Sequence, residues 1–186
     1  RGVELFSKNL FPAYFYIAVL AVLVLALSGT SISYTTETSE VPFVLTMDVS
    51  RSMGADDVVP SRIDAAKEAA SNFIDIVPSG TEIGLITFSS SPQIRSELTD
   101  NKGNLKDIIE NIELEDYGGT DVFSSVRAAS TILYPYEGGS LILISDGRVN
   151  IHSIEEIIRE SNLNGLIIHS INVGTQEGGE GDYGEK

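Results

Sequence analysis

Residues 43–52 read FVLTMDVSRS, an apolar run that ends in one carboxylate and two hydroxyls. The run 43–47 has the composition of a buried strand, and the polar side chains of Asp48, Ser50 and Ser52 follow it at alternate positions. Oxygen atoms of this kind are the ligands that a hard cation such as Mg2+ prefers. The stretch therefore predicts a buried strand with a cation site at its end.

Two later segments supply matching oxygen atoms. The glycine loop 118–121 contains Thr120, and the apolar run 142–147 ends in Asp146. The alternative for the two serines alone is that they cap a helix, which is common for this residue type. With the later segments added, the predicted metal ligands are Asp48, Ser50, Ser52, Thr120 and Asp146.

Short apolar strands alternate with amphipathic helices along residues 41–174, a pattern typical of parallel βαβ units. The predicted strands are 43–47, 82–88, 140–145 and 166–173, with an antiparallel edge strand over 93–98. The predicted helices are 63–77, 105–112, 122–133 and 153–158. We expect a doubly wound α/β fold with a mostly parallel, Rossmann-like sheet whose strands are covered on both faces. Ligand sites of such sheets collect at the carboxyl ends of the strands, where Asp48 and Asp146 lie.

In this order, the D-x-S-x-S motif, the threonine and the aspartate resemble the von Willebrand factor type A domains and their metal-ion-dependent adhesion site. The resemblance implies that Ser50, Ser52 and, in the active state, Thr120 bind Mg2+ directly, while Asp48 and Asp146 act mostly through water. Mn2+ or Ca2+ could replace Mg2+. It also implies that an acidic side chain of a partner protein completes the coordination.

The resemblance covers residues 41–174. Within it, the segments 56–67, 84–88 and 172–175 look like the prokaryotic membrane-anchored branch, which includes aerotolerance-operon proteins. One departure is Arg51, where many relatives carry glycine. Type A domains usually continue with a further helix, so the acidic, glycine-rich tail 175–186 is expected to stop short of the full domain.

A membrane segment is predicted ahead of the domain. Residues 10–27 are almost wholly apolar, and 18 helical residues span roughly 27 Å, close to the hydrocarbon thickness of a bilayer. Basic residues in the flank 1–9 and acids in and after the linker 28–40 place the domain on the extracytoplasmic side of the membrane. The alternative is a cleaved signal peptide, because small residues follow the apolar run.

Composition excludes several function classes. The chain has no cysteine and a net charge of -15, so we expect neither thiolate chemistry nor a nucleic-acid partner. No general base or nucleophile accompanies the predicted metal ligands, so no catalytic residue and no enzymatic activity are predicted. The two histidines, His152 and His169, are interpreted as a loop residue and a packed strand residue.

Three further acids have two interpretations each. Asp56 and Asp57 either form the rim of the cation site or belong to an exposed acidic loop, which is the favoured reading. Asp121 either assists the cation through water or occupies a helix N-terminus, where the helix dipole favours a carboxylate. The two glycines before it, Gly118 and Gly119, are expected to let the backbone bring Thr120 to the ion.

The functional hypothesis is a membrane-anchored, divalent-metal-dependent module that docks an acidic residue of a partner protein. The alternative is a regulatory or metal-sensing subunit of a chelatase-like or ATPase-linked assembly. A phosphate-binding loop of the form G-x-x-x-x-G-K-S/T is absent from the printed sequence, so any nucleotide chemistry would belong to another subunit.

Overall fold

The computed structural model describes residues 10–27, 41–115, 119–136, 138–147 and 151–175. The chain divides into two units, Arg1–Thr38 and Ser39–Lys186. The first contains helix α1 (Leu10–Leu27), whose side chains are exposed from Leu10 to Val24. Across the described residues, no helix has the length together with the apolar character that crossing a membrane requires. The predicted membrane span is therefore not confirmed.

The second unit is built on a five-stranded sheet in the order β3-β2-β1-β4-β5. All neighbouring strands are parallel except β2 and β3, which are antiparallel, so the predicted sheet type and the antiparallel edge strand are confirmed. The strands are β1 (Phe43–Asp48), β2 (Ile83–Phe88), β3 (Pro92–Thr99), β4 (Gly139–Ser145) and β5 (Leu166–Asn172).

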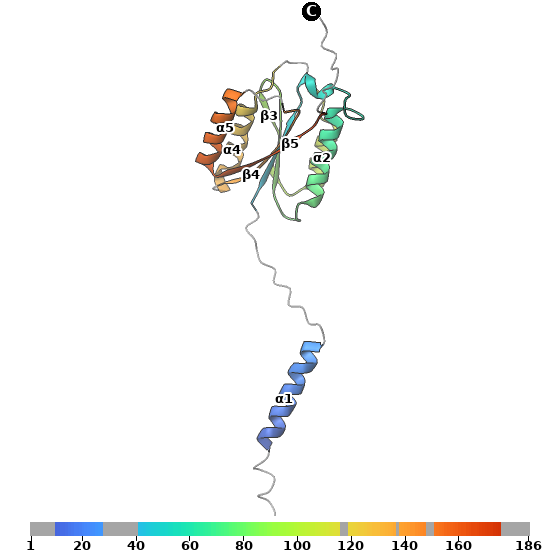
Figure 1. The fold of residues 1–186 in the computed structure, drawn as a ribbon, viewed down its shortest axis with the longest axis vertical. Coiled ribbons are helices and arrows are strands. Elements are labelled where there is room, and N and C mark those ends of the chain that lie inside the picture. The colour runs from blue at the N-terminus through green and yellow to red at the C-terminus, as the bar shows by residue number, and fades with distance from the viewer. Residues whose placement is uncertain (1–9, 28–40, 116–118, 137, 148–150, 176–186) are drawn as a thin grey trace, which may run out of the picture. The chain divides into compact units, whose positions relative to one another are not determined.

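Helices cover both faces of the sheet, as a doubly wound fold requires. Figure 1 shows α4 and α5 on one side of the strands and α2 on the other. The helices are α2 (Arg62–Ile76), α3 (Lys102–Glu110), α4 (Val122–Leu133) and α5 (Ile151–Asn164), with short 3-10 turns η1 (Arg51–Gly54) and η2 (Tyr134–Tyr136).

The alternation of side chains along each strand creates two cores. In β1, Leu45 and Met47 pack with α2 and α3, while Val44 packs with α4 on the opposite face. Every residue of β2 and β4 is buried. The central strands are thus covered on both faces, as their apolar composition predicted.

Strand β5 departs from that prediction. It lies at the edge of the sheet, where Ile167 is 59% exposed and His169 is exposed as well. The expectation that His169 is a packed residue is therefore wrong. An apolar sequence does not distinguish a central strand from an edge strand, because strand order is a property of the assembled sheet.

Helix starts agree with the sequence for α2 and α4 and differ for α3, which begins at Lys102 and not at residue 105, and for α5. The Ser61 hydroxyl accepts a hydrogen bond from the backbone N–H of Asp64 at the start of α2. Asp121 caps α4 by accepting from the N–H of Ser124 at 3.0 Å, which supports the helix-terminus reading of this residue. Helix α5 begins at Ile151, two residues before the expected start at Ser153. The expectation that His152 is a loop residue is therefore wrong, because it is the second residue of α5; its side chain lies outside the described residues.

We expect Leu45→Ala to lower the free energy of unfolding by about 2–5 kcal/mol, because Leu45 is fully buried in the middle of β1 and its removal leaves a cavity. Urea unfolding followed by circular dichroism measures the change. The matched control is Leu163→Ala at a position 75% exposed on α5, where a change within about 0.5 kcal/mol is expected. Equal losses for the two variants would contradict the assigned core.

Candidate functional site

Asp48 is the last residue of β1 and is completely buried. Its carboxylate accepts hydrogen bonds from the backbone N–H of Ser50 at 2.9 Å and from the hydroxyl of Ser145 at 3.2 Å. Burial raises the pKa of Asp48 above its usual value, the bonds from Ser50 oppose that rise, and the nearby charge of Asp146 adds to it. The two aspartates that sequence analysis selected therefore lie close enough to repel each other.

The hydroxyls of Ser50 and Ser52 lie together at the turn that follows β1. Their Oγ atoms are 3.1 Å apart and share a hydrogen bond in which either hydroxyl can be the donor. Ser50 occupies the residue before η1, but its side chain makes no capping hydrogen bond there, so the structure does not favour the capping interpretation of this residue. Two ligands at 2.0–2.1 Å from an octahedral Mg2+ lie about 3 Å from each other. The spacing of the serine hydroxyls fits that requirement.

Thr120 reaches the same edge of the sheet on a separate loop. The backbone N–H of Asp121 donates to the carbonyl of Ser89 at 2.7 Å, just beyond β2, the strand that pairs with β1. Gly119 has a φ of 133° and packs against Ser90, a conformation that favours glycine, as expected. Gly118 lies outside the described residues. Within the described part of the chain, no hydrogen bond joins Thr120 to either serine or to Asp48.

Asp146 follows β4, the other neighbour of β1, and its side chain is fully buried. Its Oδ2 accepts a hydrogen bond from Nη1 of Arg62 at 3.0 Å. Arg62 is the first residue of α2, and its side chain is only 5% exposed. A buried guanidinium thus pairs with one of the predicted metal ligands.

Sequence reasoning did not select Arg62. The available signal was its position, because a positive charge at the first residue of a helix is opposed by the helix dipole and needs nearby acids to compensate. Asp57 provides one of them: it accepts from Nε and Nη2 of Arg62 at 2.7 and 2.8 Å. The backbone N–H and the hydroxyl of Thr175 also donate to Asp57, each at 3.0 Å.

The favoured reading of Asp57 as part of an exposed acidic loop is therefore wrong, although Asp56 beside it is exposed. The side chain of Asp57 is 6% exposed because it lies under the Arg62 guanidinium. The hydrogen bonds from Arg62 hold the pKa of Asp57 well below its usual range, and those from Thr175 add to the effect. The loop between η1 and α2 is thus tied to Thr175, three residues after the end of β5.

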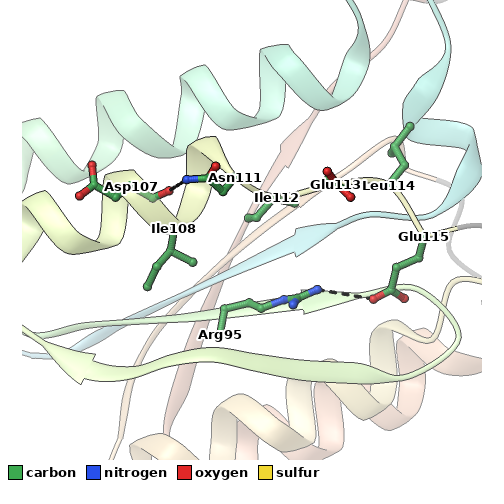
Figure 2. A pocket seen from close by; sticks show the side chains of 8 residues that line it. All are labelled: Arg95, Asp107, Ile108, Asn111, Ile112, Glu113, Leu114 and Glu115. Atoms are coloured by element: carbon green, nitrogen blue, oxygen red, sulfur yellow. Dashed lines mark hydrogen bonds and ion pairs between the residues drawn. The ribbon is translucent and has the colours of Figure 1, made fainter.

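A pocket of about 550 Å3 lies between β3 and the segment that follows α3. Figure 2 shows Arg95 reaching from β3 toward Glu115, and the two side chains are 3.6 Å apart. The backbone N–H of Glu115 donates to the carbonyl of Val49, so the pocket adjoins the turn after β1. Its remaining lining alternates polar and apolar side chains. The predicted metal ligands do not line it.

Among the described residues, no three side chains drawn from histidine, cysteine, aspartate and glutamate come together as metal ligands. A cation bound here would rely on hydroxyls and water together with the two aspartates, which is the ligand chemistry of Mg2+ rather than of Zn2+. The residues present therefore fit a hard cation. The structure brings Asp48, Ser50, Ser52 and Asp146 together and places Thr120 at the same sheet edge.

Comparison with known proteins agrees with this fold. Residues 43–148 match the family model of the von Willebrand factor type A domain. A UPF0353 protein from Mycobacterium sp. (strain KMS) is 31% identical over 150 residues, which cover 76% of this chain and 45% of that protein. The chain thus spans less than half the length of this relative.

Two solved structures share the fold over most of the chain. The conserved hypothetical protein BatB from Bacteroides thetaiotaomicron has a TM-score of 0.70 at 26% identity. The match covers 78% of this chain and 73% of the BatB chain. An aerotolerance-related membrane protein from Bacteroides fragilis has a TM-score of 0.69 at 25% identity, with coverages of 78% and 76%.

The similarity expected from the D-x-S-x-S, threonine and aspartate pattern is therefore confirmed, and with it the aerotolerance-type relatives. The domains of this family are protein-interaction modules. With the matching family model extending from the start of β1 to just past Asp146, the chain belongs to the von Willebrand factor type A domain family.

Proposed function

We propose that this chain is a binding module that docks a protein partner through a divalent cation at the carboxyl edge of its sheet. The observation that carries the proposal is the pair of serine hydroxyls 3.1 Å apart beside two buried aspartates. Ser50, Ser52 and Thr120 would hold Mg2+ directly, and Asp48 and Asp146 would orient its water. The bound ion would supply a coordination position for an acidic side chain of the partner.

The buried position of Asp48 supports the role of a cation. Every hydrogen bond that its carboxylate accepts within the described residues comes from a neutral donor, Ser50 or Ser145. Burying a carboxylate without a positive charge is unfavourable, and the raised pKa of Asp48 reflects that cost. A divalent ion next to the serines would offset it.

We also propose that residues 10–27 hold the chain at a membrane. The exposed side chains of α1 are apolar or aromatic from Leu10 to Val24 and most of them are large, and contiguous apolar surface of this kind is unfavourable in water. One similar solved structure is named as a membrane protein. The orientation of the domain, on the extracytoplasmic side, stays a prediction.

Mg2+ or Mn2+ should raise the melting temperature of the chain, because a ligand that binds only the folded state stabilises it. Differential scanning fluorimetry with millimolar Mg2+ and with EDTA measures the shift. Ser50→Ala, which removes one hydroxyl of the pair, should reduce it. Identical melting curves with Mg2+ and with EDTA would count against a cation site.

Capture of a partner from solubilised membranes should require Mg2+ and should be lost in Asp48→Asn, which removes the charge but keeps the shape of the side chain. The matched control is Asp100→Asn, at an exposed acid just after β3. Its neighbour Thr99 pairs with Ile83, the first residue of β2, so Asp100 lies at the end of the sheet opposite the predicted site. Mass spectrometry of the bound fraction identifies the partner. Capture that survives both EDTA and Asp48→Asn would reject metal-dependent docking.

The chain should remain with membranes after carbonate extraction, whereas a double variant with Leu20→Asp and Leu23→Asp should be released, because two charges in an apolar helix oppose burial in lipid. These positions are 67% and 54% exposed on α1. Immunoblots of pellet and supernatant measure the distribution. Release of the unmodified chain would refute membrane attachment through this segment.

A further inference from the structure

Arg62 lies between two carboxylates that belong to distant parts of the chain. Its Nη1 donates to Asp146 at 3.0 Å, and its Nε and Nη2 form a two-pronged contact with Asp57. The same Nη1 makes a long 3.5 Å contact with the carbonyl of Ser52. The guanidinium therefore touches the predicted site at two of its segments, the turn after β1 and the end of β4.

The contacts of Arg62 are shielded from solvent. The side chains of Arg62, Asp57 and Asp146 are 5%, 6% and 0% exposed. Gly174 lies over the guanidinium, so that a Cβ built on it would be 3.5 Å from Nε. Charges in such surroundings interact more strongly than charges in water, because little solvent screens them.

Among the described residues, the carboxylates of Asp48, Asp57 and Asp146 are nearly or fully removed from solvent, and Arg62 is the buried side chain that carries a positive charge. Asp48 and Asp146 are near enough that the charge of Asp146 contributes to the raised pKa of Asp48. Arg62 provides a positive charge to Asp146, while Asp57 shares that charge through its own two hydrogen bonds. The position of Arg62 thus decides how much of the negative charge remains for a cation.

We propose that Arg62 is a built-in counter-ion of the cation site, which neutralises Asp146 in the metal-free protein and competes with the divalent ion for it. The proposal rests on the function proposed above. In this role Arg62 is a positioning residue that sets the affinity of the site, because it stabilises the protein without metal more than the protein with metal.

Asp57 opposes Arg62 in this competition. Its two hydrogen bonds hold the guanidinium by Nε and Nη2, while Nη1 is directed at Asp146. Thr175, in the segment after β5, donates twice to the same carboxylate and holds it in place. Removing the charge of Asp57 would release Arg62 toward Asp146 and would also make the region less negative.

The test measures Mg2+ affinity of the full chain by isothermal titration calorimetry for the wild type and for charge variants. Arg62→Gln should bind Mg2+ about tenfold more tightly, because a positive charge near the ion is removed. Arg62→Lys, which keeps the charge, should stay close to the wild type. Asp57→Asn should bind Mg2+ several-fold more weakly. Asp56→Asn, at the exposed neighbouring acid, is the matched control and should change affinity least.

The melting temperature in EDTA is a second readout. Arg62→Gln should melt at a lower temperature than the wild type in EDTA and should gain more from Mg2+. The reason is that no positive charge faces Asp146 in the metal-free variant, whereas bound Mg2+ supplies one. A purely structural role would instead weaken Mg2+ binding in both Arg62→Gln and Asp57→Asn, and that result overturns the proposal.

If Arg62→Gln does not fold, Asp57→Asn decides through both readouts. Weaker Mg2+ binding with a melting temperature in EDTA close to that of the wild type supports the counter-ion role. Unchanged or tighter binding, or weaker binding together with a lower melting temperature in EDTA, overturns it. If the wild type binds Mg2+ and Arg62→Gln binds it less tightly, only this inference fails. If neither the wild type nor any variant binds Mg2+, the proposed cation site fails and the counter-ion role with it.

Discussion

The parallel pairing of β1 with both β2 and β4 is the constraint on which the rest of the structure depends. It brings the carboxyl ends of three strands to one edge of the sheet, with Asp48 beside Phe88 on one side and Met47 beside Ile144 on the other. Because every residue of β2 and β4 is buried, a shift of register would expose apolar side chains and move the polar residues at the strand ends into the core. The position of the site thus follows from the same contacts that stabilise the domain.

Burial of charge at that edge is the second constraint. Asp48 and the Asp146 side chain are removed from solvent, and their charges raise the free energy of the folded state unless something positive lies close by. Arg62 meets this need for Asp146, and Asp57 with Thr175 holds Arg62 in position. The resulting network joins the turn after β1, the start of α2, the end of β4 and the residue pair 174–175. A site whose charge is set by such a network can respond to changes at any of these segments.

Much of the fold could be predicted because the apolar runs are short, regularly spaced and separated by amphipathic segments. The central strands and helices α2, α3 and α4 lie close to their predicted ranges. The exposure of β5 and of His169 could not be predicted, since edge position depends on which strands pair. The contacts of Arg62 with Asp57 and Asp146 could not be predicted either, because a salt bridge between residues 62 and 146 leaves no pattern in one sequence. Only the unusual arginine at the start of α2 indicated that something compensates its charge.

By itself, the sequence determined the fold class, the family and the residue types that gather at the end of β1, because periodicity and local motifs are written in neighbouring residues. The tertiary structure decided which of the charged residues are buried and which of them meet. It placed the serine hydroxyls at the spacing of two cation ligands and inserted Arg62 between two aspartates. It put Thr120 on a loop at the same edge, where no hydrogen bond among the described residues joins it to either serine. The physical reason is that burial and charge pairing depend on distances through space, and the folded sheet alone sets those distances.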